Sequence, residues 1–301
     1  MKKKIYRLIF FITLATAVSA VASCEDEGED YQLGGGNGGY AANPNYLERI
    51  EVPAMKNSGT IFVQHSTKVG SDSVMTYCLE YDKNLYHSCW VAFRFDGNTR
   101  NKTVSRSDEP FTDDPKIASD LKIGNRGFGG IYNRGHLCAS ADRLYGREAN
   151  EQTFYMTNMS PQINSFNQGY WITLEEFVQN KGRDANFADT LYVCKGGTIY
   201  DNKILGYVTR TNGNKVPVPK YYFMALLRVK NGTYSSIAFY MEHKEYGYTY
   251  QKHVPMSEMA KNVVTVDELE ELTGIDFFHN LPNTIESAVE RQYSLSVWGL
   301  N

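Results

Sequence analysis

Apolar and polar positions alternate in short runs along most of the chain, and these runs predict more strands than helices. Seven runs are rich in β-branched and aromatic residues and are bounded by turn-forming residues, which is typical of strands. They are Thr60–His65, Val74–Tyr81, Trp90–Phe95, Thr153–Asn158, Thr190–Lys195, Tyr221–Val229 and Tyr234–Met241. Because few helical segments separate these runs, we expect a sheet that is mostly antiparallel or mixed.

Helical periodicity is confined to three segments. Thr265 and Glu268 form the capping-box pattern that begins a helix, and Gly274 is a suitable residue to end it. The three predicted helices are Ala139–Arg147, Asn167–Lys181 (closed by Gly182) and Val266–Thr273. The predicted fold class is therefore α+β, without a regular βαβ alternation.

The first 23 residues have the pattern of an export signal. Lys2–Lys4 precede an apolar run, Leu8–Ala22, which is shorter than the roughly 20 residues of a membrane span. The run ends at Val21–Cys24, a sequence that resembles the lipobox of bacterial lipoproteins. This resemblance implies a signal peptide over 1–23, a lipid on Cys24, and anchoring of the exported chain at the outer membrane or cell surface. An ordinary cleaved signal with an incidental Cys24 is the alternative.

Residues 24–44 have the composition of a flexible tether, with five acids in residues 25–30 and a glycine-rich run, Gly34–Gly39. That run fits the G-x-G-x-x-G pattern, but no predicted strand precedes it and no predicted helix follows. A dinucleotide site is therefore not supported. No second linker and no internal repeat follow, so we expect one domain over residues 45–301.

Composition and charge narrow the classes of protein and of partner. The chain of 301 residues is 42% hydrophobic and 22% charged, which is typical of a globular protein and excludes disorder throughout. Four of the 31 basic residues and none of the 34 acidic residues lie in the signal, so residues 24–301 carry a net charge of −7. A polyanion would therefore be bound by a local basic patch and not by the overall charge.

Apart from Cys24, the chain has four cysteines: Cys78, Cys89, Cys138 and Cys194. An even number in an exported chain favours disulfides. A turn centred on Lys83-Asn84 would place Cys78 opposite Cys89, which favours that pair and leaves Cys138–Cys194 by elimination. The other two pairings and free buried thiols remain open.

Several common catalytic motifs are absent from the sequence. There is no H-E-x-x-H, paired C-x-x-C, G-x-S-x-G or P-loop pattern, so zincins, zinc ribbons, α/β serine hydrolases and NTPases are not supported. The region that could carry chemistry is the polar stretch Asn133–Glu175. Within it, Gly135 allows a sharp backbone turn beside His136. A solvated loop histidine is the alternative interpretation.

The predicted helix after this histidine carries Asn167 and Glu175. Eight residues separate them, about 12 Å along an α-helix, so they lie near one stripe but cannot both bind one ion directly. One could be a direct ligand while the other acts through water. The aromatic residues Phe166, Tyr170 and Trp171 are interpreted as core residues, with base stacking as the alternative.

Five elements of this region occur together in a particular order. They are Asn133–Leu137 (Asn-Arg-Gly-His-Leu), Asp142-Arg143, Thr153–Gln162, Phe166–Trp171 and Leu174-Glu175. With this order and spacing, the sequence resembles the DNA/RNA non-specific endonuclease family, which includes endonuclease G. The similarity extends more weakly over most of residues 45–301. It implies the ββα-metal, or His-Me finger, fold and an enzyme that hydrolyses the phosphodiester bonds of DNA and RNA to products with 5′-phosphates.

The resemblance assigns roles to particular residues. His136 matches the general base that takes a proton from the attacking water. Asn167 matches the single direct protein ligand of Mg²⁺, which Mn²⁺ could replace. Glu175 matches an acid that reaches the metal through a water molecule. An amide oxygen together with water suits Mg²⁺, because this ion gives up its water reluctantly.

Three further polar residues follow from the same resemblance. Asn158 matches a polar residue near the scissile phosphate, and Arg134 matches a basic residue of the histidine motif. Arg106 is the candidate for an upstream arginine that stabilises charge in the transition state. Arg100 and Arg126 are alternatives to Arg106, and a solvated surface arginine is a further one.

One departure from the family pattern concerns the first residue of the histidine motif. The motif usually begins with aspartate, whereas this chain has Asn133, so a weakened or inactive nuclease is an alternative. Other candidate functions are a non-catalytic surface lipoprotein that binds nucleic acid and a phosphodiesterase for small nucleotides. Lys181 and Arg183 could steer the substrate, although a charged helix end is the simpler explanation. No protein partner is implied, and a homodimer remains open.

Overall fold

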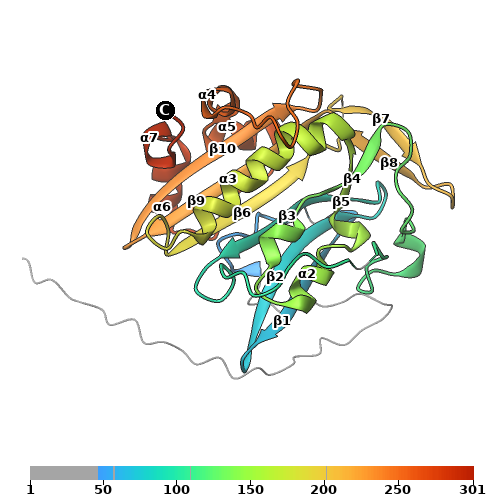
Figure 1. The fold of residues 1–301 in the computed structure, drawn as a ribbon, viewed down its shortest axis with the longest axis horizontal. Helices are drawn as coiled ribbons and strands as arrows, with labels where there is room; N and C mark the ends of the chain where they lie inside the picture. Colours follow the sequence, from blue (N-terminus) through green and yellow to red (C-terminus); the bar gives the residue numbers. More distant parts are fainter. Residues whose placement is uncertain (1–46, 57, 109, 201) are drawn as a thin grey trace, which may run out of the picture. The chain divides into compact units, whose positions relative to one another are not determined.

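Antiparallel hairpins build the central sheet of the computed structural model, which describes residues 47–301 except 57, 109 and 201. Seven strands are hydrogen-bonded in the order β1-β2-β3-β6-β9-β10-β11, and every neighbouring pair is antiparallel. Figure 1 shows their arrangement. Their bounds are β1 Thr60–Val69, β2 Asp72–Asp82, β3 His87–Phe95, β6 Thr190–Gly197, β9 Tyr221–Lys230, β10 Thr233–Glu242 and β11 Val263–Val264.

Both faces of this sheet are buried. Successive residues of β3 alternate between two apolar clusters: Val91 and Phe93 join one, Trp90 and Ala92 the other. Helix α3 (Ile172–Arg183) covers the first face, as Figure 1 shows, and its Leu174 belongs to that cluster. Helices α5 (Val266–Thr273) and α6 (Asn283–Glu290) contribute to the other cluster. Two-sided burial explains why the central strands read as nearly continuous apolar runs.

Two smaller two-stranded sheets accompany the central one. Strand β4 (Tyr132–His136) pairs antiparallel with β5 (Met159–Ile163), and β7 (Ile204–Thr209) with β8 (Lys215–Pro219). A π-helix, η4 (Phe166–Trp171), joins β5 to α3. The remaining short helices are η1 Ser119–Leu121, η2 Ser140–Arg143, α2 Arg147–Gln152, η3 Met156–Asn158, α4 Met256–Met259, η5 Ala260–Asn262 and α7 Leu295–Trp298.

The α+β class and the antiparallel sheet are confirmed, as are six of the seven expected strands to within a few residues. The start and end of α5 are also confirmed. The Thr265 hydroxyl accepts from Glu268 N at 3.1 Å, Thr265 N donates to the Glu268 carboxylate at 2.8 Å, and Gly274 has a left-handed φ of 69°. These signals are local and therefore readable from the sequence.

Residues 153–158 do not form the expected strand. Met156 N donates to Thr112 O at 2.9 Å, and the Asn158 side chain donates to Thr153 O at 2.7 Å. These backbone groups therefore make hydrogen bonds that do not belong to a β-sheet ladder. Strand β5 begins only at Met159.

The expected boundaries of two helices are also wrong. Residues 139–147 form a short 3-10 turn, η2, and not one helix, because Gly146 is extended (φ −165°) and α2 starts after it. Gly182 lies inside α3, which ends at Arg183. A Cβ on Gly182 would lie 2.3 Å from the Phe95 ring. Close packing against β3 accounts for this glycine, and helix termination does not.

All four described cysteines are buried free thiols, so the expected pairs Cys78–Cys89 and Cys138–Cys194 are wrong. Cys78 lies opposite Ala92, since the turn after Asp82 is longer than expected and the pairing is irregular beside Tyr81. Cys138 and Cys194 belong to clusters on opposite faces of the sheet.

The expected signal peptide, the lipid site at Cys24, the tether and its glycine-rich run lie outside the described residues. Among residues that are described, no helix combines the length and the apolar character needed to cross a bilayer.

Candidate active site

The C-terminal end of β4 carries His136, opposite Met159 of β5. The neighbouring Gly135 allows the two strands to approach, because a Cβ there would lie 2.2 Å from the Gln162 side chain. Asn133 also lies on β4, paired with Gln162. The β4-β5 pair, η4 and α3 together form a ββα unit.

Asn158 fixes the backbone immediately after His136. Its carboxamide oxygen accepts from Cys138 N at 2.8 Å, and its nitrogen donates to Cys138 O at 2.8 Å and to Thr153 O at 2.7 Å. Its carbonyl accepts from Leu137 N at 3.0 Å. The side chain is fully buried, so the structure gives Asn158 backbone partners and not an open path to a phosphate.

The His136 ring lies between two aromatic rings, with centroid distances of 5.6 Å to Phe111 and 5.3 Å to Phe154. The residue is half-buried, but its Nε2 is shielded from solvent and has no hydrogen-bond partner among the described residues. Burial, and then the charges of Arg106, Lys195 and Arg134, lower the pKa of His136 to about 3. The ring is therefore neutral near pH 7 and able to accept a proton.

Two arginines flank these aromatic rings. The Arg134 guanidinium lies 3.7 Å from the centre of Phe111 and donates to Asn125 O at 2.6 Å. The guanidinium of the exposed Arg106 lies 4.9 Å from the centre of Phe154. Two positive charges thus lie at the ring pair that holds His136.

The other two arginines considered from the sequence have different surroundings. Arg100 donates to the carbonyls of Asp96, Ala188 and Asp189. Arg126 is exposed, and its carbonyl accepts from Arg210 at 2.7 Å. Among the three, Arg106 is the one whose charge lowers the pKa values of both His136 and Glu175.

Asn167 and Glu175 enter the site through η4 and the first turn of α3. Asn167 is half-buried within the π-helix, and the indole nitrogen of Trp171, at its end, donates to His136 O at 3.1 Å. The expected alignment of Asn167 and Glu175 assumed a regular α-helix. A π-turn contains one more residue than an α-helical turn, so the eight-residue separation corresponds to about seven α-helical residues. At about 3.6 residues per turn this is close to two full turns, so the π-turn brings Asn167 and Glu175 nearer to one stripe. Such turns often occur at functional sites.

Glu175 is a half-buried carboxyl group whose Oε1 is shielded and has no hydrogen-bond partner among the described residues. Burial raises its pKa to about 8, although Lys195 and Arg106 act in the opposite direction. The two unpartnered atoms, His136 Nε2 and Glu175 Oε1, together with the Asn167 amide, are polar groups available to a hydrated ion. Amide and carboxylate oxygens with water suit Mg²⁺, so the residues present fit a metal site.

Lys195 is a residue of the site that sequence reasoning missed. It lies on β6, fully buried, and its ammonium lies 2.8 Å from the equally buried Asp142 carboxylate. Asp142 also accepts from Ala139 N at 2.9 Å and from the Gln179 side chain at 3.0 Å. The Asp142-Arg143 motif was a signal for Asp142, but no local pattern marked Lys195, 53 residues away.

Lys181 and Arg183 have packing partners at the other end of α3. The Lys181 ammonium lies 4.6 Å from the Phe187 ring centre. Arg183 donates to Ala141 O and lies 5.6 Å from the Phe95 ring centre. These contacts account for both residues without a role in substrate steering.

Comparisons with known proteins agree on one family. The family model of the DNA/RNA non-specific endonucleases matches residues 57–284. Mitochondrial endonuclease G of Homo sapiens is 24% identical over 215 residues, 68% of each chain. A nuclease of Nostoc sp. is 28% identical, and the match covers 71% of this chain and 75% of that nuclease. A nuclease of Syncephalastrum racemosum is 25% identical, and the match covers 80% of both chains. A chain from the solved complex of EndoG with EndoGI superposes with a TM-score of 0.56 at 22% identity, covering 73% of this chain and 88% of that one.

Proposed function

Because this chain belongs to the DNA/RNA non-specific endonuclease family, we propose that it is a metal-dependent endonuclease that hydrolyses phosphodiester bonds of DNA and RNA and leaves 5′-phosphate ends. One observation carries the proposal. The ββα unit puts a neutral histidine, His136, and an acid with one unpartnered oxygen, Glu175, within the electrostatic reach of the same two cations, Arg106 and Lys195.

In this proposal the residues of the chain have separate tasks. The neutral His136 ring accepts a proton from the water that attacks phosphorus. Arg134 and Arg106 bind the phosphate and offset its growing negative charge. A bound phosphate would also offset the positive charges that lower the pKa of His136, which would make the ring a stronger base. Asn158 positions His136 through the backbone and does not contact substrate.

Asn167 would hold the metal directly through its amide oxygen, and Glu175 would hold it through water. We propose Mg²⁺ as the ion, with Mn²⁺ as a functional replacement. When bound, the ion supplies charge stabilisation at the phosphate and at the leaving oxygen. Because such a site binds phosphate and not base edges, we expect little sequence preference.

Plasmid and RNA cleavage by the purified protein, with Mg²⁺ and with a chelator, tests the function. His136→Ala should reduce cleavage by about 10²–10⁴-fold, since it removes the base, with little loss of stability. His279→Ala, a half-buried histidine outside the ββα unit, should retain activity. Persistent nicking by His136→Ala would refute the role of His136. Binding of intact DNA without cleavage would instead support a non-catalytic binding protein, and cleavage of dinucleotides alone would support a small-substrate phosphodiesterase.

We also propose that the chain is exported and anchored through a lipid on Cys24. The proposal is supported by the lipobox-like Val21–Cys24 sequence that follows the apolar run. Cys24→Ala should move the protein out of the membrane fraction of the producing cells. An unchanged distribution would contradict the lipid anchor.

A further inference from the structure

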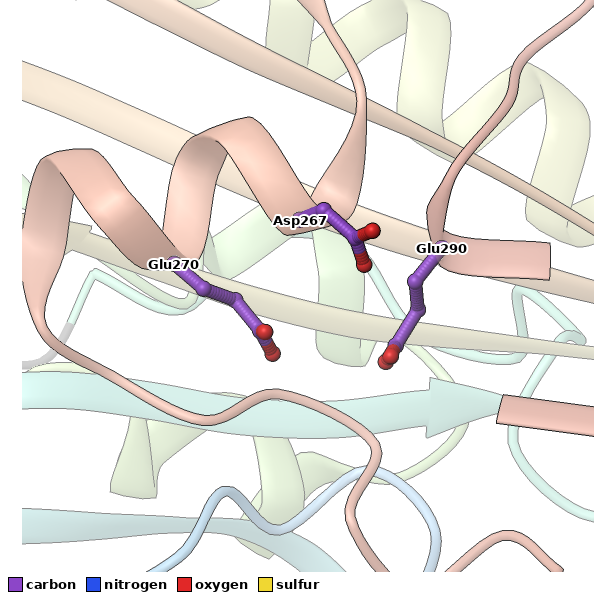
Figure 2. A group of neighbouring side chains, drawn as sticks. All are labelled: Asp267, Glu270 and Glu290. Atoms are coloured by element: carbon purple, nitrogen blue, oxygen red, sulfur yellow. The ribbon is translucent and has the colours of Figure 1, made fainter. Parts of the chain in front are cut away.

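A second group of chemically active side chains lies on the sheet face opposite α3. Asp267 and Glu270 project from α5, and Glu290 is the last residue of α6. Figure 2 shows the three side chains turned toward one common space, and each offers a carboxylate oxygen within 4.8 Å of the others. Two helices that are separate in the sequence therefore bring three acids together.

Glu290 is the unusual member of this group. Glu290 is only 4% exposed, and its Oε1 has no hydrogen-bond partner among the described residues. A buried carboxylate oxygen without a partner is energetically costly, and such groups are rare in folded proteins. The Glu290 carboxyl group is turned toward Asp267 and Glu270, so a ligand between the three carboxyl groups could supply the partner that Oε1 lacks.

The charges that act most strongly on Glu290 come from acidic residues. The groups that act on Glu290 are the acids Glu270, Glu286, Asp267 and Asp276, which together with burial raise its pKa to about 9. The acids Asp276, Asp267 and Glu286 likewise raise the pKa of Glu270. The backbone N of Phe277 donates to the Glu270 carboxylate at 2.7 Å. His279 lowers the pKa of Glu286. These carboxyl groups therefore disfavour one another's ionised form across a shared space, an effect that a bound cation would offset.

We propose that Asp267, Glu270 and Glu290 bind one divalent cation, with Ca²⁺ preferred over Mg²⁺. All of the protein ligands are carboxylate oxygens, which suit hard cations. The three ligand oxygens all lie within 4.8 Å of one another, close enough to share one ion. Three carboxylates favour Ca²⁺, because Mg²⁺ keeps several water ligands and is usually bound through one or two carboxylates. Asp267 and Glu270 are half-buried, so water can reach the remaining coordination positions.

The position of this site, between α5 and α6, indicates that a bound cation would stabilise the packing of these helices. Helices α5 and α6 both pack against β10, and the Ser236 hydroxyl of β10 donates to Val289 O, next to Glu290, at 2.6 Å. A cation shared by the two helices would hold this layer to the sheet on the face opposite the ββα unit. The proposal does not depend on the proposed nuclease function.

Thermal unfolding of the full-length protein, stripped of metal with a chelator and dialysed, tests the site. At about one hundred times its Kd, Ca²⁺ should raise Tm by roughly 5 °C or more, and Mg²⁺ at the same concentration should raise it less. Glu290→Gln should raise the Tm of the metal-free protein, because it removes a carboxyl group whose ionised form the folded protein disfavours, and should abolish the response to Ca²⁺. Asp267→Asn should weaken the same response and provides a second test if Glu290→Gln does not fold.

Two control variants make the result specific. Glu271→Gln changes an exposed acid of α5 outside the group and should retain the full Ca²⁺ response. Asn167→Ala removes the proposed ligand of the nuclease site and should also retain it. Isothermal titration of Ca²⁺ should show one site that Glu290→Gln loses while Mg²⁺-dependent cleavage continues. An absent Ca²⁺ response, or one that persists unchanged in both Glu290→Gln and Asp267→Asn, would overturn the proposal.

Discussion

At the scale of single residues, a buried neutral histidine holds the end of β5 through two hydrogen bonds. His243 donates from Nδ1 to Pro219 O at 2.8 Å and accepts at Nε2 from Ile163 N at 2.7 Å. A ring that donates from one nitrogen and accepts at the other is neutral. Burial lowers the pKa of His243 to about 4, which is consistent with these two hydrogen bonds.

This histidine should make stability depend on pH. Between pH 6.5 and about 4 the unfolded chain binds a proton at His243 that the folded chain does not, so stability is fully present above 6.5 and falls as pH decreases. The loss by pH 5 is about 2 kcal/mol. His243→Gln can still accept from Ile163 N but cannot titrate. Urea unfolding at pH 7 and pH 5 should therefore show the advantage of the wild type shrinking at pH 5, and parallel pH profiles would contradict this.

At the scale of elements, the π-helix η4 determines where Asn167 lies relative to α3. Its central glycine, Gly169, is packed against another segment, since a Cβ there would lie 2.4 Å from the carbonyl oxygen of Tyr248. A backbone atom cannot move aside as a flexible side chain can. The shape of η4 therefore depends on contact with residues about 80 positions later in the chain.

Gly169→Ala should disturb this element. We expect a loss of about 1–3 kcal/mol in the free energy of unfolding, as for overpacked sites, and lower cleavage activity because Asn167 shifts with η4. Gly97→Ala is a matched control, because a Cβ at Gly97 meets no atom within 4 Å. Urea midpoints and plasmid cleavage measure both effects. A Gly169→Ala variant as stable and active as the control would show that η4 tolerates the added group.

At the scale of the whole described fold, the Asp142–Lys195 ion pair joins the central sheet to the ββα unit. Lys195 comes from β6, Asp142 from η2, and the Gln179 side chain of α3 donates to the same carboxylate. Both charged groups are fully buried, so each depends on the other to offset the cost of leaving water.

Lys195→Met should leave Asp142 charged, buried and unpaired, at a cost of about 3–5 kcal/mol. Adding Asp142→Asn removes that charge and keeps a side chain that can accept from Ala139 N, so the double variant should be more stable than Lys195→Met alone. Urea midpoints with unchanged m-values measure the difference. If the two substitutions were simply additive, the pair would not be coupled.

Several features of this protein could be predicted because their causes are local in the chain. The capping box of α5 involves residues three positions apart, and the apolar runs of β9 and β10 follow from the burial of consecutive residues. The motifs around His136, Asn167 and Glu175 marked the ββα unit because the residues proposed to carry its chemistry are close together in sequence.

Other features were decided only by tertiary contacts. In the π-turn, Gly169 packs closely against the backbone of Tyr248. Residues 153–158 do not form a strand, because they make hydrogen bonds with Thr112 and with the Asn158 side chain. Lys195 pairs with Asp142, which lies 53 positions away in the sequence. Sequence alone therefore determined the class of fold and predicted most residues of the candidate site, but not Lys195. The folded chain decided their geometry, because burial and the pairing of buried polar groups depend on partners that sequence distance does not reveal.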